Sequence, residues 1–418
     1  MSASVVSSMT TEILVPPHIS DLKGYEPGLG SEEIKRRYGL ERVVKLASNE
    51  NPLGSSPQAV QRAREALANL ARYPTGGLAL RHKLAELYGV SVDNVIAGSG
   101  SEGIISNIVR TFLSDEDEVL TTEAAFLGFQ VLARGRGVPY RTVPYRNWHY
   151  DLTALADAIS PKTKLIYLAN PNNPTGTFFA RQAFEQFHKR VPERVLIILD
   201  EAYYEFGVVE QSYPDSMHYR FDNVITPRTF SKAYGLAGAR VGYGFAHEDL
   251  ISVLLRVKLP FEPSGPSEAA ALGSLEDREF MIRTVANNAT GLAYLTQSLR
   301  EMGFDVVPSA GNFCDDRAAR RTAGEGYVSK PAGARSDYSP TCHNGAAELS
   351  ARIRRDTGGE RVFHTDAETE SGIDNIESRI GFTRVVRSPF LLSWRDRMPE
   401  GGVISFVEGR KASAQILL

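Results

Sequence analysis

Residues 194–206 read RVLIILDEAYYEF, an apolar run that ends at a carboxylate, Asp200. Short runs rich in Val, Ile and Leu recur along the chain at residues 94–98, 118–122, 164–170 and 223–227. None alternates strictly, which is typical of strands buried on both faces of a parallel sheet. The stretches between them, such as residues 101–113, carry apolar residues at the spacing of a helix. This alternation predicts an α/β protein with a mainly parallel sheet flanked by helices.

The composition favours a small-molecule partner. The chain has 418 residues, is 42% hydrophobic and carries a net charge of -3. It can bury a large core and is long enough for two domains. It has no excess of positive charge that would attract nucleic acid or an anionic membrane. No stretch has 18 uninterrupted apolar residues, and the first 25 residues lack the pattern of a signal peptide. We therefore expect a cytoplasmic protein.

The chain divides into a large and a small domain. We expect residues 53–285 to form the large, ligand-binding domain. Residues 267–304 indicate long helices that lead out of the sheet, and residues 304–309 indicate a strand beyond them. Residues 286–313 would then begin a smaller α+β domain, to which the N-terminal arm, residues 1–52, also contributes.

Several polar residues stand at the carboxyl ends of the predicted strands, where open α/β sheets bind ligands. Residues 94–109 read as strand, glycine turn and helix start, which offers the amides of Ser101 and Glu102 to an anion. A lone glycine turn is weak evidence, and an ordinary loop is the alternative. Asp200 either caps a helix, the commoner role, or meets a cation in the cleft.

Residues 223–243 add an amine and a guanidinium. Lys232 lies among small and hydroxyl residues, including Thr229 and Ser231, and Arg240 follows eight positions later. An isolated lysine is usually a solvated surface charge, but small neighbours let the backbone approach a ligand. Together with Asp200 and the helix start, these groups fit pyridoxal phosphate: a lysine for the Schiff base, a carboxylate for the pyridine nitrogen and an anion site for the phosphate.

The ordered set of motifs resembles the class I/II, fold-type I aminotransferases, and within them the histidinol-phosphate aminotransferase family. The resemblance covers residues 25 to 313 and rests on KGYEPG (23–28), KLASNENPLG (45–54), ARYPTGG (71–77), GSGSEGI (98–104), NPNNPTG (170–176), DEAYYEF (200–206) and TFSKAYGLAGARVGYG (229–244). Any one motif could arise by chance, whereas the set in this order is specific.

The resemblance implies a role for each matching residue. Lys232 would carry the cofactor and move the proton between the substrate's alpha carbon and the cofactor, and Asp200 would pair with the pyridine nitrogen. Asn173 and Tyr203 would hydrogen-bond the cofactor's phenolic oxygen. The phosphate would be held by Ser101, Glu102, Ser231 and Arg240, with Thr229 as a further candidate.

Three aromatic residues have less direct matches. Phe126 stands where the family has a ring-stacking tyrosine, and a plain core aromatic is its alternative. Tyr73 matches the tyrosine that reaches the phosphate of the neighbouring subunit, which implies a homodimer, and a tyrosine buried inside one subunit is the alternative. Tyr25 matches a residue near the substrate side chain. The histidines match no metal-ligand spacing, so no metal is expected.

The implied reaction transfers an amino group from L-histidinol phosphate to 2-oxoglutarate, which gives imidazole acetol phosphate and L-glutamate in histidine biosynthesis. An aromatic aminotransferase or a threonine-phosphate decarboxylase would share the same cofactor residues. An inactive protein that binds pyridoxal phosphate without transamination is an alternative of another class.

The pattern breaks at Phe313. Residues 314–418, here called the tail, are rich in Arg, Ala and Gly, show almost no apolar periodicity and contain both cysteines, Cys314 and Cys342. The family continues at this point with a strand, a helix and an arginine that grips the substrate's carboxylate, and the tail has none of these motifs. Arg379 and Arg384 match no motif and are not assigned. A disordered extension and a replaced domain are two explanations.

A third explanation is one extra base at Phe313 or Cys314. If each codon is taken as the last two bases of one residue's codon and the first base of the next, the tail permits VMI for residues 314–316 and LLEQGVIIRPL for residues 331–341. Residues 345–361 likewise permit GLPNYLRVSVGTPEENE. These segments restore the missing family motifs in the right order. We therefore expect the tail to be out of frame, irregular and poorly packed.

Overall fold

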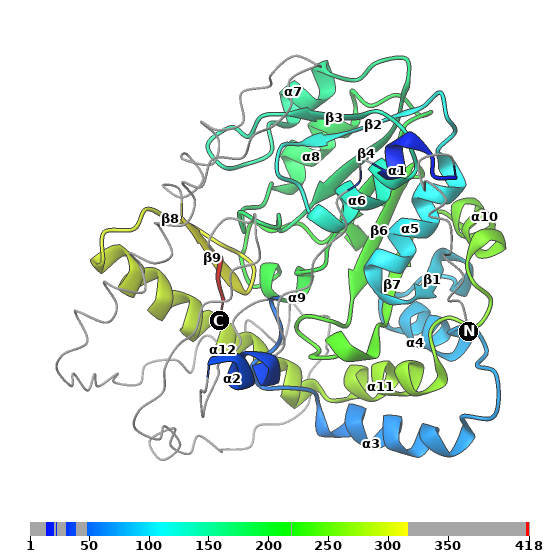
Figure 1. The fold of residues 1–418 in the computed structure, drawn as a ribbon, viewed down its shortest axis with the longest axis vertical. Helices are drawn as coiled ribbons and strands as arrows, with labels where there is room; N and C mark the ends of the chain where they lie inside the picture. The colour runs from blue at the N-terminus through cyan, green and yellow to red at the C-terminus, as the bar shows by residue number, and fades with distance from the viewer. Residues whose placement is uncertain are drawn as a thin grey trace, which may run out of the picture.

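The computed structural model describes residues 14–20, 22, 31–38, 48–218, 220–316 and 415–417. Its centre is a 7-stranded sheet, whose strands lie among helices in Figure 1. In sheet order the strands are β1 (Val95–Gly98), β7 (Gly242–Phe245), β6 (Val224–Thr229), β5 (Leu196–Asp200), β4 (Thr163–Ala169), β2 (Glu118–Thr122) and β3 (Tyr140–Val143). Only β7 runs antiparallel to its neighbours in this sheet. The predicted mainly parallel α/β sheet is confirmed.

Helices cover both faces of this sheet because its central strands are apolar on both sides. In β4, Leu165 and Tyr167 face one core and Ile166 and Leu168 face the other, as the period of two requires. The first core is closed by α5 (Gly100–Phe112), α6 (Leu127–Gly135) and α10 (Glu248–Val257). The second is closed by α7 (Leu152–Asp157) and α8 (Arg181–His188).

A third core surrounds the β1–β7 side of the sheet. It is formed with α3 (Pro57–Ala66), α4 (Leu78–Tyr88) and α11 (Gly265–Glu276). The shorter elements are α1 (Pro17–Ser20), α2 (Ser31–Tyr38), α9 (Tyr204–Gly207), η2 (Leu67–Asn69), η3 (Val92–Asn94), η4 (Ser216–His218) and η5 (Ala237–Ala239). Among the residues described, no helix is both long and apolar enough to cross a membrane.

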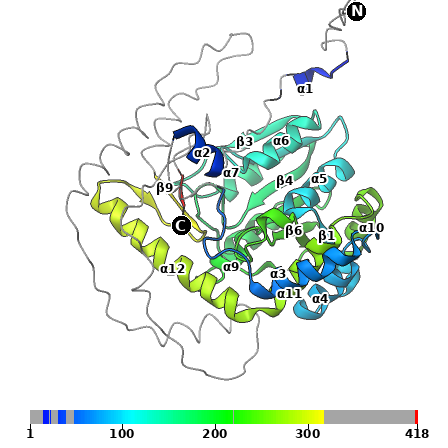
Figure 2. The same cartoon turned by 60° about the horizontal axis from the view of Figure 1, so that its bottom comes forward.

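The long helix α12 (Arg278–Glu301) leads from the sheet domain to a small antiparallel sheet, as Figure 2 shows. That sheet has the order β10 (Gln415–Leu417), β9 (Phe313–Asp316) and β8 (Val306–Val307). The predicted domain boundary at residue 286 falls inside α12, which is continuous.

The break at Phe313 lies at the start of β9. Because residues 314–316 and 415–417 form regular paired strands, the expectation of an irregular tail is wrong for these two segments. The rest of the tail, including Cys342, Arg379 and Arg384, lies outside the described residues.

Candidate active site

The predicted site residues gather at the carboxyl ends of neighbouring strands. Asp200 is the last residue of β5, Asn173 follows β4 and Lys232 follows β6. Because β4, β5 and β6 are adjacent and parallel, these three side chains come from the same edge of the sheet. The helix start at Gly100 follows β1 at the same end.

Asp200 is a buried carboxylate, 4% exposed, held by two donors. The Tyr167 hydroxyl donates to its Oδ2 at 2.8 Å, and the Ala202 amide donates to its Oδ1 at 3.1 Å. Burial raises the pKa of Asp200 to about 6, while the hydrogen bonds and the positive charge of Lys232 act in the opposite direction. The site therefore fixes a desolvated carboxylate that a cationic ligand group would stabilise.

Lys232 is a half-buried amine. Its Nζ donates to the Ser48 carbonyl at 2.9 Å and lies 5.6 Å from the centroid of the Tyr203 ring. Burial lowers the pKa of Lys232 to about 8, although the charge of Glu50 opposes this shift. A lysine with this pKa has an appreciable neutral, nucleophilic fraction near neutral pH.

Tyr203 lies beside Lys232 and is 3% exposed. Its hydroxyl oxygen accepts from the Asn49 Nδ2 at 2.5 Å and from the Asn173 Nδ2 at 3.3 Å. Burial raises the pKa of Tyr203, so the phenol keeps its proton. The Phe313 ring packs edge-on against it with centroids 5.1 Å apart.

The predicted phosphate residues form a cradle at the N-terminus of α5. The Ser99 side chain makes no capping bond there, and the first turn carries Ser101 and Glu102. Arg240 lies between η5 and β7, and its guanidinium contacts two of these residues. Its Nη1 donates to the Ser231 Oγ at 3.4 Å, and its Nη2 lies 3.9 Å from the Glu102 Oε2. A helix N-terminus beside a guanidinium favours an anion.

The backbone at Gly100 lies close to the Arg240 guanidinium. Its φ of +78° is left-handed, and a Cβ there would lie 2.9 Å from the Arg240 Nη2. Any larger residue would therefore strain the backbone and crowd the guanidinium. Ser101, Glu102, Ser231 and Arg240 thus lie at one place, and their contacts to a phosphate stay a prediction.

Phe126 and Thr229 have local structural roles as well. The Phe126 ring lies over Gly128. A Cβ added to Gly128 would meet this ring and would lie 2.9 Å from the Glu102 Oε1. The ring also packs against the core between the sheet, α5 and α6. Phe126 therefore adjoins the cradle and the core together. Thr229 is buried, and its hydroxyl accepts from the Ser231 amide at 3.1 Å. A phosphate contact by Thr229 stays a prediction.

Tyr73 points away from its own core. It is 80% exposed and stacks on Phe261 with ring centroids 4.2 Å apart, so the alternative of a tyrosine buried inside one subunit is wrong. Tyr25 lies outside the described residues, and its role near the substrate stays a prediction.

Several residues that contact the site residues lie far from them in the sequence, and their contacts were not predicted. Tyr167 holds Asp200, and residues 48–50 contact both Lys232 and Tyr203. The turn before β9 also reaches the site, because the Ala310 amide donates to the Gly176 carbonyl at 2.8 Å. Gly176 has a φ of +75°, and a Cβ there would lie 2.1 Å from the Ser309 Oγ, so this contact requires glycine.

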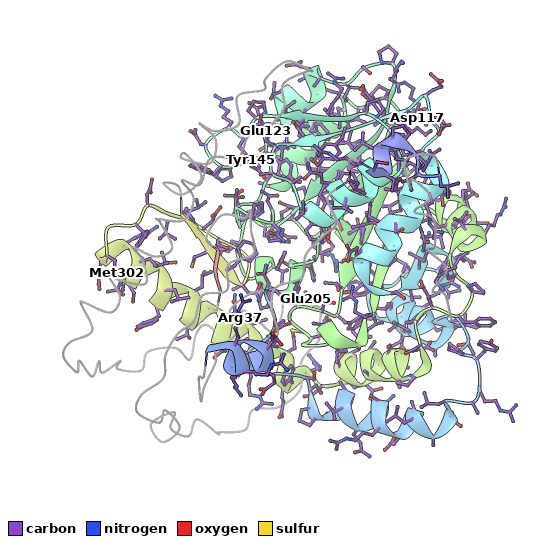
Figure 3. All side chains as sticks on the ribbon, in the orientation of Figure 1. Arg37, Asp117, Glu123, Tyr145, Glu205 and Met302 are labelled. Carbon is purple, nitrogen blue, oxygen red and sulfur yellow. The ribbon has the colours of Figure 1, made fainter. Side chains whose placement is uncertain are left out.

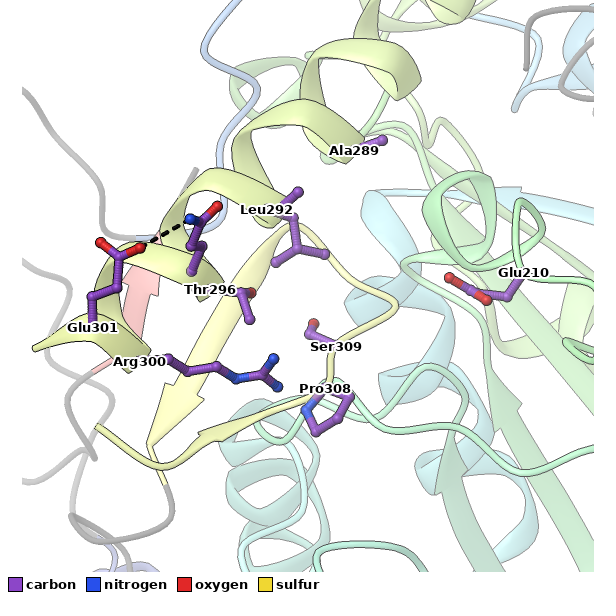
Figure 4. Close-up of a pocket in the computed structure, with 10 residues that line it drawn as sticks. Glu210, Ala289, Leu292, Thr296, Arg300, Glu301, Pro308 and Ser309 are labelled. Atoms are coloured by element: carbon purple, nitrogen blue, oxygen red, sulfur yellow. Dashed lines mark hydrogen bonds between the residues drawn. The ribbon is translucent and has the colours of Figure 1, made fainter. Parts of the chain in front are cut away.

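A groove of about 740 Å³ lies elsewhere, between α12 and the turn that leads to β9. Figure 4 shows Arg300 on one wall and Glu210 on the opposite side, with Ser309 between them. Glu301 accepts a hydrogen bond from Gln297 at 2.9 Å on the outer surface of α12. None of the residues that line this groove is a predicted cofactor residue, although Ser309 belongs to the turn that contacts Gly176.

Comparison with known proteins agrees with this geometry. A family model described as aminotransferase class I and II matches residues 41–314. The chain belongs to this family. The match ends one residue after Phe313, at the position where the sequence pattern changes.

Within that family, two similar relatives and one similar solved structure are named histidinol-phosphate aminotransferase. Histidinol-phosphate aminotransferase 2 of Hydrogenovibrio crunogenus is 42% identical over 302 residues, which cover 72% of this chain and 81% of the relative. Histidinol-phosphate aminotransferase 1 of Idiomarina loihiensis is 40% identical over 72% of this chain and 82% of its own length. A crystal structure of histidinol-phosphate aminotransferase from Sinorhizobium meliloti in complex with pyridoxal-5'-phosphate has a TM-score of 0.66 and 30% identity, and the match covers 75% of this chain and 83% of that chain.

Proposed function

We propose that the protein is a histidinol-phosphate aminotransferase that uses pyridoxal 5'-phosphate. It would transfer the amino group of L-histidinol phosphate to 2-oxoglutarate, yielding imidazole acetol phosphate and L-glutamate. The names of the relatives support the substrate, and membership of the aminotransferase family supports the reaction type. The observation that carries the proposal is the convergence of Lys232, Asp200 and the anion cradle at one edge of the sheet.

The described residues fit this cofactor in charge and shape. The cradle of Gly100, Ser231 and Arg240 suits a phosphate, because it combines a helix N-terminus with a guanidinium and a hydroxyl. Asp200, buried and with a raised pKa, suits a protonated pyridine nitrogen. Lys232 supplies an amine of lowered pKa.

When bound, the cofactor supplies an aromatic ring that accepts electrons from the substrate. The protein's own residues do the rest. Asp200 would hold a positive charge at the ring nitrogen, and Tyr203 and Asn173 would orient the ring through its phenolic oxygen. The Lys232 Nζ would take a proton from the substrate's alpha carbon as a general base and give it back on the cofactor side as a general acid.

A coupled assay with L-histidinol phosphate and 2-oxoglutarate tests this function. It should be run on the 418-residue chain and on a chain whose tail is restored to the other reading frame. We expect the restored chain to turn over. The 418-residue chain should bind cofactor but have a kcat/KM lower by about 10²-fold or more, because its tail has no match to the family motif whose arginine grips the carboxylate of a substrate such as 2-oxoglutarate. Cofactor binding without turnover by either chain would contradict the substrate assignment and leave the family assignment standing.

A second candidate function follows from where the family match ends. The match stops at residue 314, and the tail that follows has no match to the family's carboxylate-binding arginine motif. The 418-residue chain would then act as a protein that binds pyridoxal phosphate without transamination. This function is favoured if the 418-residue chain shows the cofactor's absorbance but turns over no amino donor, while the restored chain does turn over. Turnover of an aromatic amino acid in preference to histidinol phosphate would instead favour another aminotransferase.

A homodimer is the second part of the proposal. Large apolar side chains are exposed on the two segments that meet at Tyr73 and Phe261, namely Leu67, Leu70 and Leu78 on the first and Leu259 and Phe261 on the second. The Lys258 Nζ donates to the Gly76 carbonyl at 3.3 Å and joins these two segments. Exposed apolar side chains that lie together favour a protein interface. Light scattering should give twice the mass of one chain, and a monomer at micromolar concentration would contradict a dimer. The cytoplasmic location stays a prediction.

A further inference from the structure

Residues 48–50 form a turn that enters the site from the N-terminal arm. Ser48 and Asn49 have φ angles of +77° and +55°, so two consecutive residues other than glycine adopt the left-handed conformation. Asparagine tolerates this region, but serine rarely enters it. Strain of this kind persists where surrounding contacts fix the backbone, and such places cluster at functional sites.

The contacts that fix this turn all lead to the active site. The Ser48 carbonyl accepts from the Lys232 Nζ at 2.9 Å, and the Asn49 carbonyl accepts from the Asn312 Nδ2 at 3.2 Å. Just beyond the turn, the Asn51 Nδ2 donates to the Ala233 carbonyl at 2.8 Å. The turn is therefore tied to the loop of Lys232 and to the segment before β9.

Asn49 itself is 4% exposed, and its side-chain amide donates to the Tyr203 hydroxyl oxygen at 2.5 Å. Asn173 donates to the same oxygen at 3.3 Å. A phenol has one hydrogen to donate and two lone pairs to accept with. Since two amides occupy the accepting side of Tyr203, its own O–H is directed away from both of them.

We propose that Asn49 is a positioning residue that sets Tyr203 as a hydrogen-bond donor to the phenolic oxygen of the cofactor. This rests on the proposed function, because it requires a bound pyridoxal phosphate. Asn49 acts through Tyr203: its amide fixes which way the phenolic hydrogen points before the cofactor arrives. The left-handed turn is the backbone arrangement that delivers the amide to this oxygen.

The variants Asn49→Ala and Asn49→Asp separate this role from simple packing. Aspartate has nearly the shape of asparagine but accepts where the amide donates, so it should draw the Tyr203 proton toward itself and away from the cofactor. The measured quantity is the pH midpoint of the absorbance change of the bound cofactor. In the proposal, the hydrogen bond from Tyr203 keeps this midpoint low. Asn49→Ala should raise this midpoint by roughly one pH unit, the effect of one weakened hydrogen bond. Asn49→Asp should raise it by about two units, since it also adds a negative charge.

Asn49→Gly controls for backbone strain. Glycine accepts the left-handed conformation without cost, so this variant loses the amide while keeping the turn. It should match Asn49→Ala in the pH midpoint and melt at a higher temperature. It therefore keeps the test valid if Asn49→Ala folds poorly. In both variants kcat should fall more than KM rises, because Tyr203 contacts the reacting cofactor and not the distal part of the substrate.

The outcomes are distinct. A midpoint that rises from wild type through the alanine and glycine variants to the aspartate variant supports the proposal. Midpoints equal to that of the wild type overturn it, and so does an aspartate variant that lies nearest the wild type, because shape would then be what matters. If the wild-type chain itself shows no cofactor absorbance, the proposed function fails, and this inference fails with it.

Discussion

At the scale of single residues, the site is a set of groups whose burial tunes their protonation. Burial lowers the pKa of Lys232 to about 8 and raises the pKa of Asp200 to about 6. Between about pH 6 and pH 8 the carboxylate is charged while a growing fraction of the amine is neutral. The site is therefore suited to hold a cation at Asp200 and to offer a nucleophile at Lys232 in the same pH range.

The pKa of Lys232 predicts how the empty protein captures its cofactor. Only the neutral amine attacks the aldehyde of the cofactor, and its fraction grows as the pH rises toward about 8. The rate of capture should therefore rise almost tenfold per pH unit below pH 8 and level off above it. Stopped-flow absorbance on the cofactor-free chain measures this rate. A rate that is flat below pH 8, or one that still climbs steeply at about pH 10, would contradict the lowered pKa.

The sequence predicted the candidate catalytic residues but not the residues that hold them in place. Lys232, Asp200 and Arg240 could be predicted because each stands in a short motif at a strand end. Asn49 and Tyr203 are 154 positions apart, and no local pattern indicates that contact. Tyr167 lies within an apolar strand, and nothing in the local sequence indicates that its hydroxyl donates to Asp200. Supporting contacts of this kind depend on the tertiary structure.

At the scale of elements, a buried ion pair joins the ends of β5 and β6. Arg228 is fully buried, and its Nη2 lies 2.7 Å from the Glu201 Oε2 and 3.0 Å from the Asp215 Oδ1. Its guanidinium also covers the Tyr204 ring at 3.4 Å. Glu205, labelled in Figure 3, lies on the same short helix, α9, which contacts α12. This network holds in place the turn between Asp200 and Tyr203.

Removing Arg228 should destabilise the fold, because it leaves the buried carboxylates unpaired. We expect Arg228→Met to lower the free energy of unfolding by about 3 to 5 kcal/mol. Urea denaturation measures this loss. Arg181→Met is the matched control: Arg181 is 52% exposed in its pair with Glu185, so its loss should cost less than about 1 kcal/mol. Equal effects of the two variants would mean that the buried network contributes no special stability.

The strands absent from the sequence prediction are those with atypical composition. The strand β3 lies at the edge of the sheet, and its burial is partial. The strand β7 reads GYGF, and its glycines obscure the pattern of an apolar strand. In contrast, the five runs rich in Val, Ile and Leu all became strands. Apolar periodicity therefore predicted the buried centre of the sheet but not its less regular members.

At the scale of the whole molecule, the cofactor site belongs to the part of the chain before the break. The last residues before it are integral to the site, since Asn312 contacts Asn49 and Phe313 packs against Tyr203. Immediately beyond it, β9 places Asp315 in the sheet with an exposure of 1%. The other reading frame permits methionine at this position, a residue better suited to burial.

The frame hypothesis predicts a single extra base at the codons of Phe313 and Cys314. Resequencing the gene there should show it, and the restored chain should then carry the family's later motifs. The restored chain should also melt at a higher temperature than the 418-residue chain, because its small domain would be complete. An intact mass that matches all 418 residues in an active protein would contradict the hypothesis.

The central claim is that Lys232 carries pyridoxal phosphate in a site assembled before Phe313. Borohydride reduction of the cofactor-loaded 418-residue chain, followed by peptide mass mapping, tests it most directly, because it does not depend on the tail or on the amino donor. We expect one cofactor-sized adduct on the peptide that contains Lys232, and none there in Lys232→Arg. An adduct on another lysine, or no adduct under saturating cofactor, would show that Lys232 does not carry the cofactor.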